Sequence, residues 1–145
     1  MVQPQVLQKY ALFGGLTEDQ IKNVLPNMLN ETYNPDDMII TEGKPNDKIY
    51  FLIEGQVSVI KRDTVLSKFS EGEVFGEMEV LDVMPAAASI KALTPVTLIS
   101  VSNKALRNIY KTDITAFSLI IMNLARDLSR RLRRMDEKMV QPVLL

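Results

Sequence analysis

The residues with the clearest capacity for chemistry lie in one stretch of the sequence, Phe75 to Ala92. Gly76 follows a strand-like segment and lets the backbone turn without steric conflict at Cβ. The residues Glu77 to Asp82 predict a very short helix, which Pro85 ends. The start of such a helix carries unpaired N–H groups and a partial positive charge, so this arrangement suits an anion.

The neighbouring residues predict contact with the rest of a ligand. Glu77 is expected to accept a hydrogen bond from a sugar or another hydroxyl group. The small residues Ala86, Ala87 and Ala88 leave room for the backbone to approach a ligand closely. Taken alone, however, these residues are more typical of a turn glycine, a solvent-exposed acid and close packing against a strand, with Ser89 capping a loop.

The amino-acid inventory excludes several kinds of chemistry. The sequence contains no cysteine and no histidine, which excludes disulfides, thiolate nucleophiles, histidine bases and the usual zinc sites. The remaining acids, such as Asp36, Asp37 and Asp82, show neither calcium-loop nor paired-carboxylate spacing. We therefore predict no catalytic residue, no metal site and no cofactor, and an enzyme is the least expected class.

Length and composition predict one globular domain over residues 1–145, since 46% of the residues are apolar. The net charge of −1 gives no electrostatic reason for binding nucleic acid or an acidic membrane. No signal peptide is visible at the start, and the densest apolar run, Phe117 to Leu124, is too short to span a membrane. We expect a cytoplasmic protein.

The elements that must position these residues fall into three parts. Residues 1–32 predict short helices, one of them opened by a capping box from Thr17 to Gln20. Residues 33–101 predict short strands separated by turns, which is typical of an all-β sandwich, roll or barrel. The predicted strands are Met38–Ile40, Lys48–Ile53, Gln56–Ile60, Val65–Phe69, Glu73–Phe75, Ser89–Leu93 and Val96–Val101.

Residues 102–139 predict a short helix capped by Ser102 and a long helix from Asp113 to Met139. The long helix carries one apolar stripe with steps of three and four residues. Its first part is expected to pack on the strands, whereas beyond Leu124 it is expected to pair with the same helix of a second copy. Its arginines are better explained as a solvated face than as a nucleic-acid site, because acids interrupt them and no aromatic residues alternate with them. The stripe consists of Ile114, Phe117, Ile121, Leu124, Leu128, Leu132, Met135 and Met139.

The stretch from Phe75 to Ile90 resembles the phosphate-binding cassette of the cyclic nucleotide-binding domain family, which includes bacterial catabolite activator proteins and protein kinase A regulatory subunits. The segments Glu42–Asp47, Tyr50–Gly55 and Gly72–Glu77 are similar to other turns of that family. The resemblance implies a mainly β fold with flanking helices. It specifies an eight-stranded antiparallel β-roll of jelly-roll topology with short N-terminal helices and a long C-terminal helix.

The resemblance also implies a ligand, cAMP or cGMP, and two groups of contacts. The cassette contacts would come from Phe75, Gly76, Glu77, Met78, Ala86, Ala87, Ala88 and Ser89. The long helix reads the base in this family, so its polar residues Asn123, Arg126, Asp127 and Arg130 are candidates for that role.

Two residues depart from the cassette pattern. The arginine that pairs with the cyclic phosphate in the family is matched by Ala86, and a small residue is matched by Glu79. A charge-assisted hydrogen bond contributes about 1.5–3 kcal/mol, so the missing arginine is expected to weaken binding roughly 10- to 150-fold.

Three hypotheses follow. The first is a stand-alone sensor in which the ligand repositions the long helix of a homodimer. The second is a degenerate domain that no longer binds cyclic nucleotide and serves as a dimeric protein-interaction module. The third is a transcription regulator. It would need a separate DNA-binding partner chain, because the helix-turn-helix that follows the long helix in the family's activators has no counterpart here; we expect no DNA binding by this chain alone.

Overall fold

The structure is a computed structural model and describes residues 2–140. Its helical elements are α1 (Pro4–Leu7), η1 (Ala11–Phe13), α2 (Glu18–Val24), η2 (Leu25–Asn27), α3 (Glu77–Asp82), α4 (Asn103–Thr112) and α5 (Ile114–Met139). Its strands are β1 (Leu29–Tyr33), β2 (Met38–Ile40), β3 (Lys48–Glu54), β4 (Val57–Lys61), β5 (Thr64–Phe69), β6 (Val74–Phe75), β7 (Ser89–Ala92) and β8 (Val96–Ser102).

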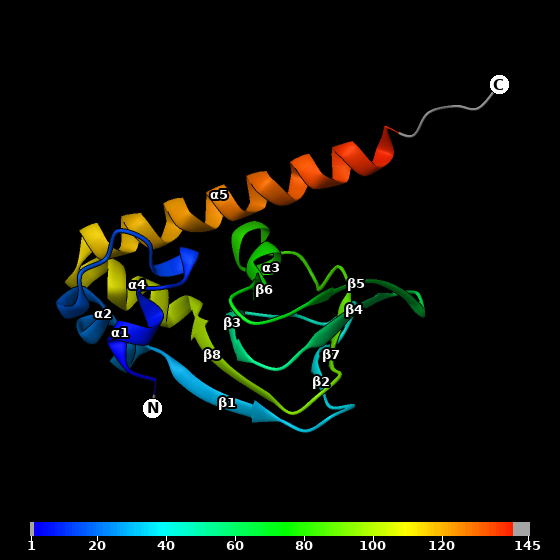
Figure 1. Ribbon diagram of the computed structural model, residues 1–145, viewed down its shortest axis with the longest axis horizontal. Helices are drawn as coiled ribbons and strands as arrows, with labels where there is room; N and C mark the ends of the chain where they lie inside the picture. Colours follow the sequence, from blue (N-terminus) through cyan, green and yellow to red (C-terminus); the bar gives the residue numbers. More distant parts are fainter. Residues whose placement is uncertain (1, 141–145) are drawn as a thin grey trace.

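The eight strands form two four-stranded antiparallel sheets, in the orders β1-β8-β3-β6 and β2-β7-β4-β5. The sheets form the β-roll, and helices lie at one end and along one side of it (Figure 1). Side chains alternate along β3, so that Ile49 and Phe51 face the helices whereas Tyr50 and Leu52 fill the roll. The predicted fold class is confirmed.

Two local predictions from the sequence need correction. The first strand is Leu29–Tyr33 rather than Met38–Ile40. The centre of Leu29–Tyr33 is polar, so the sequence shows no apolar pattern there. This strand nevertheless pairs with β8 over its whole length. The apolar stripe of α5 also meets the core only in part: Phe117 and Ile121 pack against the core, and Leu124 is buried in it. Ile114 is 57% exposed and Phe117 and Ile121 are only half-buried.

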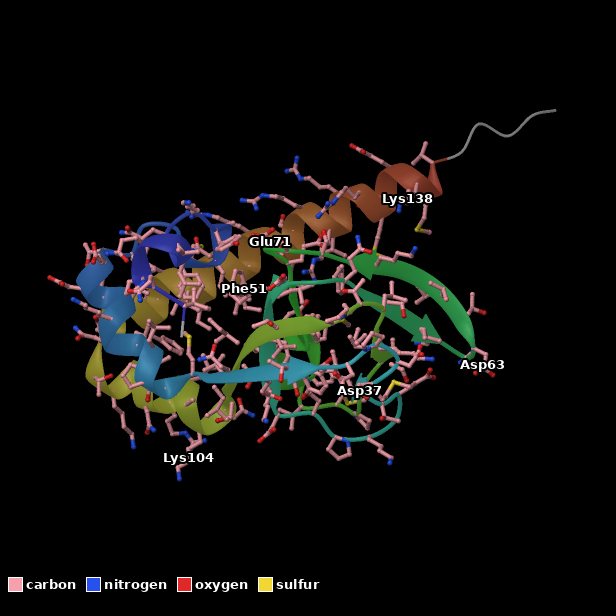
Figure 2. All side chains as sticks on the ribbon, turned by 60° about the horizontal axis from the view of Figure 1, so that its bottom comes forward. Asp37, Phe51, Asp63, Glu71, Lys104 and Lys138 are labelled. Atoms are coloured by element: carbon pink, nitrogen blue, oxygen red, sulfur yellow. The ribbon has the colours of Figure 1, made fainter. Side chains whose placement is uncertain are left out.

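The most deeply buried residues of α5 mostly lie one position before the stripe residues, and the two sets share Leu124. These buried residues are Ala116, Ile120, Asn123 and Leu124. The helix then passes α3 and continues beyond it (Figure 1), and all its residues after Arg131 are exposed. Lys138 marks this protruding end, and Asp63 marks the tip of the β4–β5 hairpin (Figure 2). The apolar stripe therefore remains at least partly open to solvent over most of its length.

The N-terminal segment connects the helices to the roll. Phe51 of β3 makes edge-on contacts with the rings of Tyr10 and Phe13, with centroid distances of 5.0 and 5.4 Å. Asn123 of α5 donates hydrogen bonds to the backbone oxygens of Leu12 (2.9 Å) and Gly14 (3.0 Å). These contacts hold the first half of α5 firmly on the body of the protein.

Between residues 2 and 140, no helix is both long enough and apolar enough to cross a membrane.

Candidate ligand site

The site begins with a glycine that the fold requires. Gly76 has φ +82°, and a Cβ at this position would lie 2.6 Å from the backbone oxygen of Lys48. The side-chain amide of Asn46 bridges the two segments, because its Nδ2 donates to the oxygens of Lys48 (2.9 Å) and Gly76 (3.2 Å). This close approach fixes the start of α3 against β3 and places Glu77 at the first position of the helix.

Glu77 is bound by the C-terminal helix. Its side chain is buried, and its Oε1 accepts a hydrogen bond of 2.8 Å from Nη1 of Arg131. The Arg131 guanidinium also contacts Asp127 Oδ2 at 2.9 Å and donates to the backbone oxygen of Val74. Its central carbon lies 4.8 Å from the centroid of the Phe69 ring. One side chain of α5 thus contacts α3, β5 and β6.

The cassette carries a second buried acid. Burial raises the pKa of Glu77, and the opposing effect of the Arg131 charge does not cancel the rise. Glu79 is 9% exposed, and burial together with the Glu77 charge raises its pKa as well. The cassette thus carries two buried carboxyl groups, and only Glu77 contacts the Arg131 guanidinium.

The segment from Ala86 to Ser89 offers few free hydrogen-bond donors. Ala86 is buried and pairs through its N–H with the Lys44 oxygen and through its oxygen with the Gly43 N–H, both at 2.9 Å. The hydroxyl of Ser89 accepts a hydrogen bond of 2.9 Å from the Glu42 N–H. By contrast, the N–H groups of Ala87 and Ala88 make no hydrogen bond to any residue between 2 and 140. These two groups remain available to an anion.

The other predicted cassette residues have different surroundings. Phe75 is 2% exposed and stacks between the rings of Tyr50 (5.1 Å) and Phe69 (6.2 Å), so it supports the site from beneath. Met78 is 51% exposed and could meet a ligand only from the outer side of α3.

On α5, the structure brings a different arginine to the cassette from those expected. Arg126 and Arg130 are exposed, and Arg126 Nη1 donates to Asn123 Oδ1 at 3.4 Å. Asn123 is buried and holds the N-terminal segment, and Asp127 contacts Arg131. Arg131 was not among the site residues predicted from the sequence. The available signal was its spacing, since it lies four residues after Asp127 and seven after the buried Leu124.

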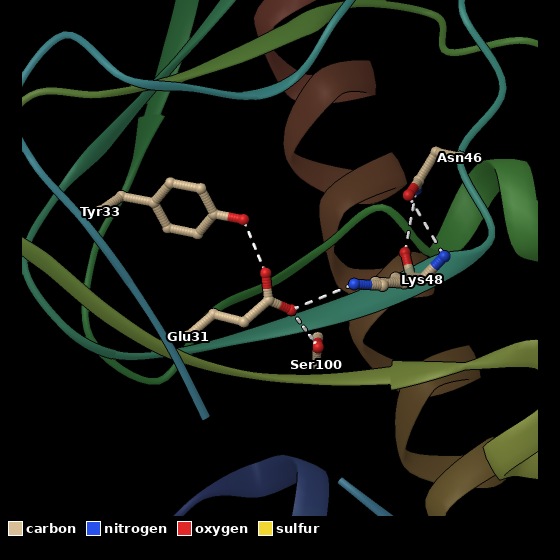
Figure 3. A network of polar contacts seen from close by, with 5 residues as sticks. All are labelled: Glu31, Tyr33, Asn46, Lys48 and Ser100. Atoms are coloured by element: carbon tan, nitrogen blue, oxygen red, sulfur yellow. Dashed lines mark hydrogen bonds and ion pairs between the residues drawn. The ribbon is translucent and has the colours of Figure 1, made fainter. Parts of the chain in front are cut away.

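A second polar cluster surrounds Glu31 and includes Lys48 (Figure 3). Glu31 of β1 accepts hydrogen bonds from the hydroxyl groups of Tyr33 (2.6 Å) and Ser100, and Lys48 Nζ lies 3.5 Å from its Oε2. Burial opposes ionisation of Glu31, but the hydrogen bonds from Ser100 and Tyr33 and the Lys48 charge outweigh it and lower the pKa.

The family model of the cyclic nucleotide-binding domain matches residues 30–113, which is more than half of the chain. The protein therefore belongs to the cyclic nucleotide-binding domain family.

Individual relatives agree with this assignment. The chain is 28% identical to human cGMP-dependent protein kinase 2 over 123 residues, which cover 85% of this chain and 16% of the kinase. It is 26% identical over 140 residues to the CRP-like cAMP-activated global transcriptional regulator of Mycobacterium tuberculosis, covering 93% of this chain and 61% of the regulator. The chain thus spans less than two thirds of these relatives.

Among solved structures, a cyclic nucleotide-binding domain from Methylobacillus flagellatus matches with a TM-score of 0.84 and 25% identity. The match covers 99% of this chain and 83% of that one.

Proposed function

We propose that this protein is a cyclic nucleotide sensor in which ligand binding at the cassette changes the position of α5. The observation that carries the proposal is the ion pair between Glu77 and Arg131. A ligand hydroxyl that binds Glu77 must share this carboxylate with α5. The ligand and the helix are therefore linked through one side chain.

The family and its relatives support the choice of ligand. Members are named for dependence on cGMP or activation by cAMP, and Gly76, Glu77 and the free N–H groups of Ala87 and Ala88 retain part of a site for a sugar and an anion. The role is regulatory rather than enzymatic, and we place it in the cytoplasm.

Calorimetric titration with cAMP and with cGMP tests the ligand. We expect saturable binding that Glu77→Gln weakens, because the variant loses the charged acceptor while keeping its size. Glu73→Gln, in the turn before β6, serves as the matched control. Absence of heat with both nucleotides would reject the sensor.

Helix movement needs a separate measurement. The sequence has no cysteine, so spin labels can be attached to Lys68→Cys and Lys138→Cys, both exposed. We expect the distance distribution between β5 and the end of α5 to change on adding nucleotide. A distribution unaffected by a nucleotide that binds would reject the coupling.

The second candidate is a domain that has lost its ligand and acts as a dimeric interaction module, and Ala86 and Glu79 favour it. Restoring the arginine with Ala86→Arg discriminates between the two. Binding that appears only in this variant would identify the natural site as degenerate.

Both candidates include a homodimer through α5, because Leu132, Met135 and Met139 are 58–79% exposed on the protruding end. Sedimentation should show a dimer that Leu132→Glu dissociates. A monomeric parent protein would reject this part of the proposal.

A further inference from the structure

The cassette of this protein has a cyclic-phosphate site without an arginine of its own, and Glu79 adds a buried carboxyl group beside it. The N–H groups of Ala87 and Ala88 are neutral donors, and neutral donors bind an anion less strongly than charged ones do. An anionic ligand here needs a cation from another element. Among the described residues, Arg131 is the cation that contacts the cassette glutamate.

We infer that Arg131 supplies this cation, so that the guanidinium of α5 binds the phosphate of a ribonucleoside 3′,5′-cyclic phosphate in place of the missing cassette arginine. The inference rests on the proposed function and assigns a ligand-binding role to a residue outside the cassette.

The Arg131 guanidinium has more N–H donors than its contacts use. Arginine carries five N–H groups, and the contacts of Arg131 to Glu77, Val74 and Asp127 engage Nη1 once and Nη2 twice. The second Nη1 hydrogen and the Nε hydrogen have no partner in residues 2–140. The Arg131 side chain as a whole is 19% exposed.

The chemistry of the ligand places a phosphate beside these donors. In a 3′,5′-cyclic phosphate, the 2′-hydroxyl stands on the carbon next to the one that bears the 3′-oxygen of the phosphate. Oε2 of Glu77 accepts no hydrogen bond from another described residue, so it is free for the 2′-hydroxyl. The Arg131 guanidinium, which is bonded to Oε1 of the same carboxylate, is then the charged group of α5 that the neighbouring phosphate can meet.

The surroundings hold the guanidinium ready for this role. The Phe69 ring and the Val74 oxygen fix its plane from the roll, and Asp127 fixes it from within α5. A planar guanidinium group that binds a carboxylate through the N–H groups of one edge can bind a phosphate through those of another edge. The ligand would then bridge α3 and α5 instead of separating them.

Cyclic AMP affinities of four proteins test the inference by calorimetry. Compared with the parent protein, Arg131→Gln should weaken binding roughly 10- to 150-fold. Arg133→Gln removes the same charge from an exposed position two residues further along α5 and should leave the affinity unchanged. Adding Ala86→Arg to Arg131→Gln should restore most of the loss, because a cassette arginine then takes over the phosphate.

The outcomes separate this inference from the proposed function. No binding by the parent protein would overturn both. If the parent protein binds cyclic AMP and Arg131→Gln leaves the affinity unchanged or increases it, only the inference about Arg131 is overturned. Arg131 would then merely block access to Glu77. If Arg131→Gln does not fold, Arg131→Lys replaces it. Lysine keeps the charge but loses the planar fork, so Arg131→Lys should bind more weakly than the parent, and the Ala86→Arg/Arg131→Lys double variant should bind more tightly than Arg131→Lys alone.

Discussion

Two glutamates, Glu31 and Glu77, are each held away from solvent beside a cation, and their pKa values shift in opposite directions. Glu31 lies among partners of its own sheet, Tyr33 on β1, Ser100 on β8 and Lys48 on β3, and its pKa is lowered. Glu77 receives its cation from α5, 54 residues later in the chain, and its pKa is raised. Burial opposes ionisation of both carboxyl groups, but the Glu77 side chain is more deeply buried (4% exposed, against 19% for Glu31) and has fewer donors, so burial prevails at Glu77 and the donors prevail at Glu31.

This difference separates a structural acid from one available to a ligand. The partners of Glu31 are fixed by strand pairing, and replacing any of them would require the sheet to change. The partner of Glu77 belongs to a helix whose remaining turns are exposed, so the pair can open without unfolding the roll. Asn46 and Lys48 join the clusters around these two glutamates through their contacts with Gly76.

Replacing Gly76 breaks the link between the clusters and should have the largest effect. Gly76→Ala combines a left-handed φ with a Cβ placed 2.6 Å from the Lys48 oxygen, and should lower the free energy of unfolding by about 3 kcal/mol in urea denaturation. Gly43→Ala is the control, since Gly43 has φ +83° with nothing within 4 Å. Equal losses in the two variants would show that the close approach at Gly76 contributes nothing.

Removing the charge of Glu31 should have the next largest effect. Glu31→Gln should destabilise the protein by about 1–2 kcal/mol at neutral pH, because charged hydrogen bonds become neutral ones. Since the pKa of Glu31 is lowered from 4.5 by folding, this contribution is present above that value and is lost as the pH falls through the folded-state pKa. Urea denaturation at neutral pH and at about pH 3 measures the difference. A loss that persists in acid would contradict the charge argument.

The sequence predicted the cassette well because its signals are local. The short helix Glu77–Asp82 and the strand starting at Ser89 occur where Gly76, Pro85 and the alternating residues placed them. The capping box at Thr17, the cap at Ser102 and the long helix are confirmed for the same reason.

The sequence could not reveal features that depend on distant contacts. Strand β1 has a polar centre because Glu31 turns inward to Ser100, 69 residues later. The buried face of α5 likewise depends on Asn123 reaching the N-terminal segment. Periodicity gives the faces of a helix but does not show which face meets the core.

Neutralising Glu79 should stabilise the protein and so act in the opposite direction to the Glu31 change. Because burial and the Glu77 charge raise the pKa of Glu79, its ionised form weakens the fold once the pH rises through that pKa. Glu79→Gln should add about 1 kcal/mol at neutral pH. The gain should vanish as the pH falls towards the ordinary value of 4.5, and Glu137→Gln on the exposed end of α5 is the control. A gain that does not depend on pH would indicate better packing rather than a removed charge.

Replacing Lys48 should have the smallest effect and tests what holds Glu31. Its ammonium lies 3.5 Å from the carboxylate and its side chain is 32% exposed, so Lys48→Met should cost at most about 0.5 kcal/mol. Ser100 is 1% exposed, and Ser100→Ala, which removes a buried donor, should cost about 1–3 kcal/mol. If Lys48→Met proved the more harmful of the two, Glu31 would depend on a single cation, as Glu77 does on Arg131. The two clusters would then differ only in which element carries that cation.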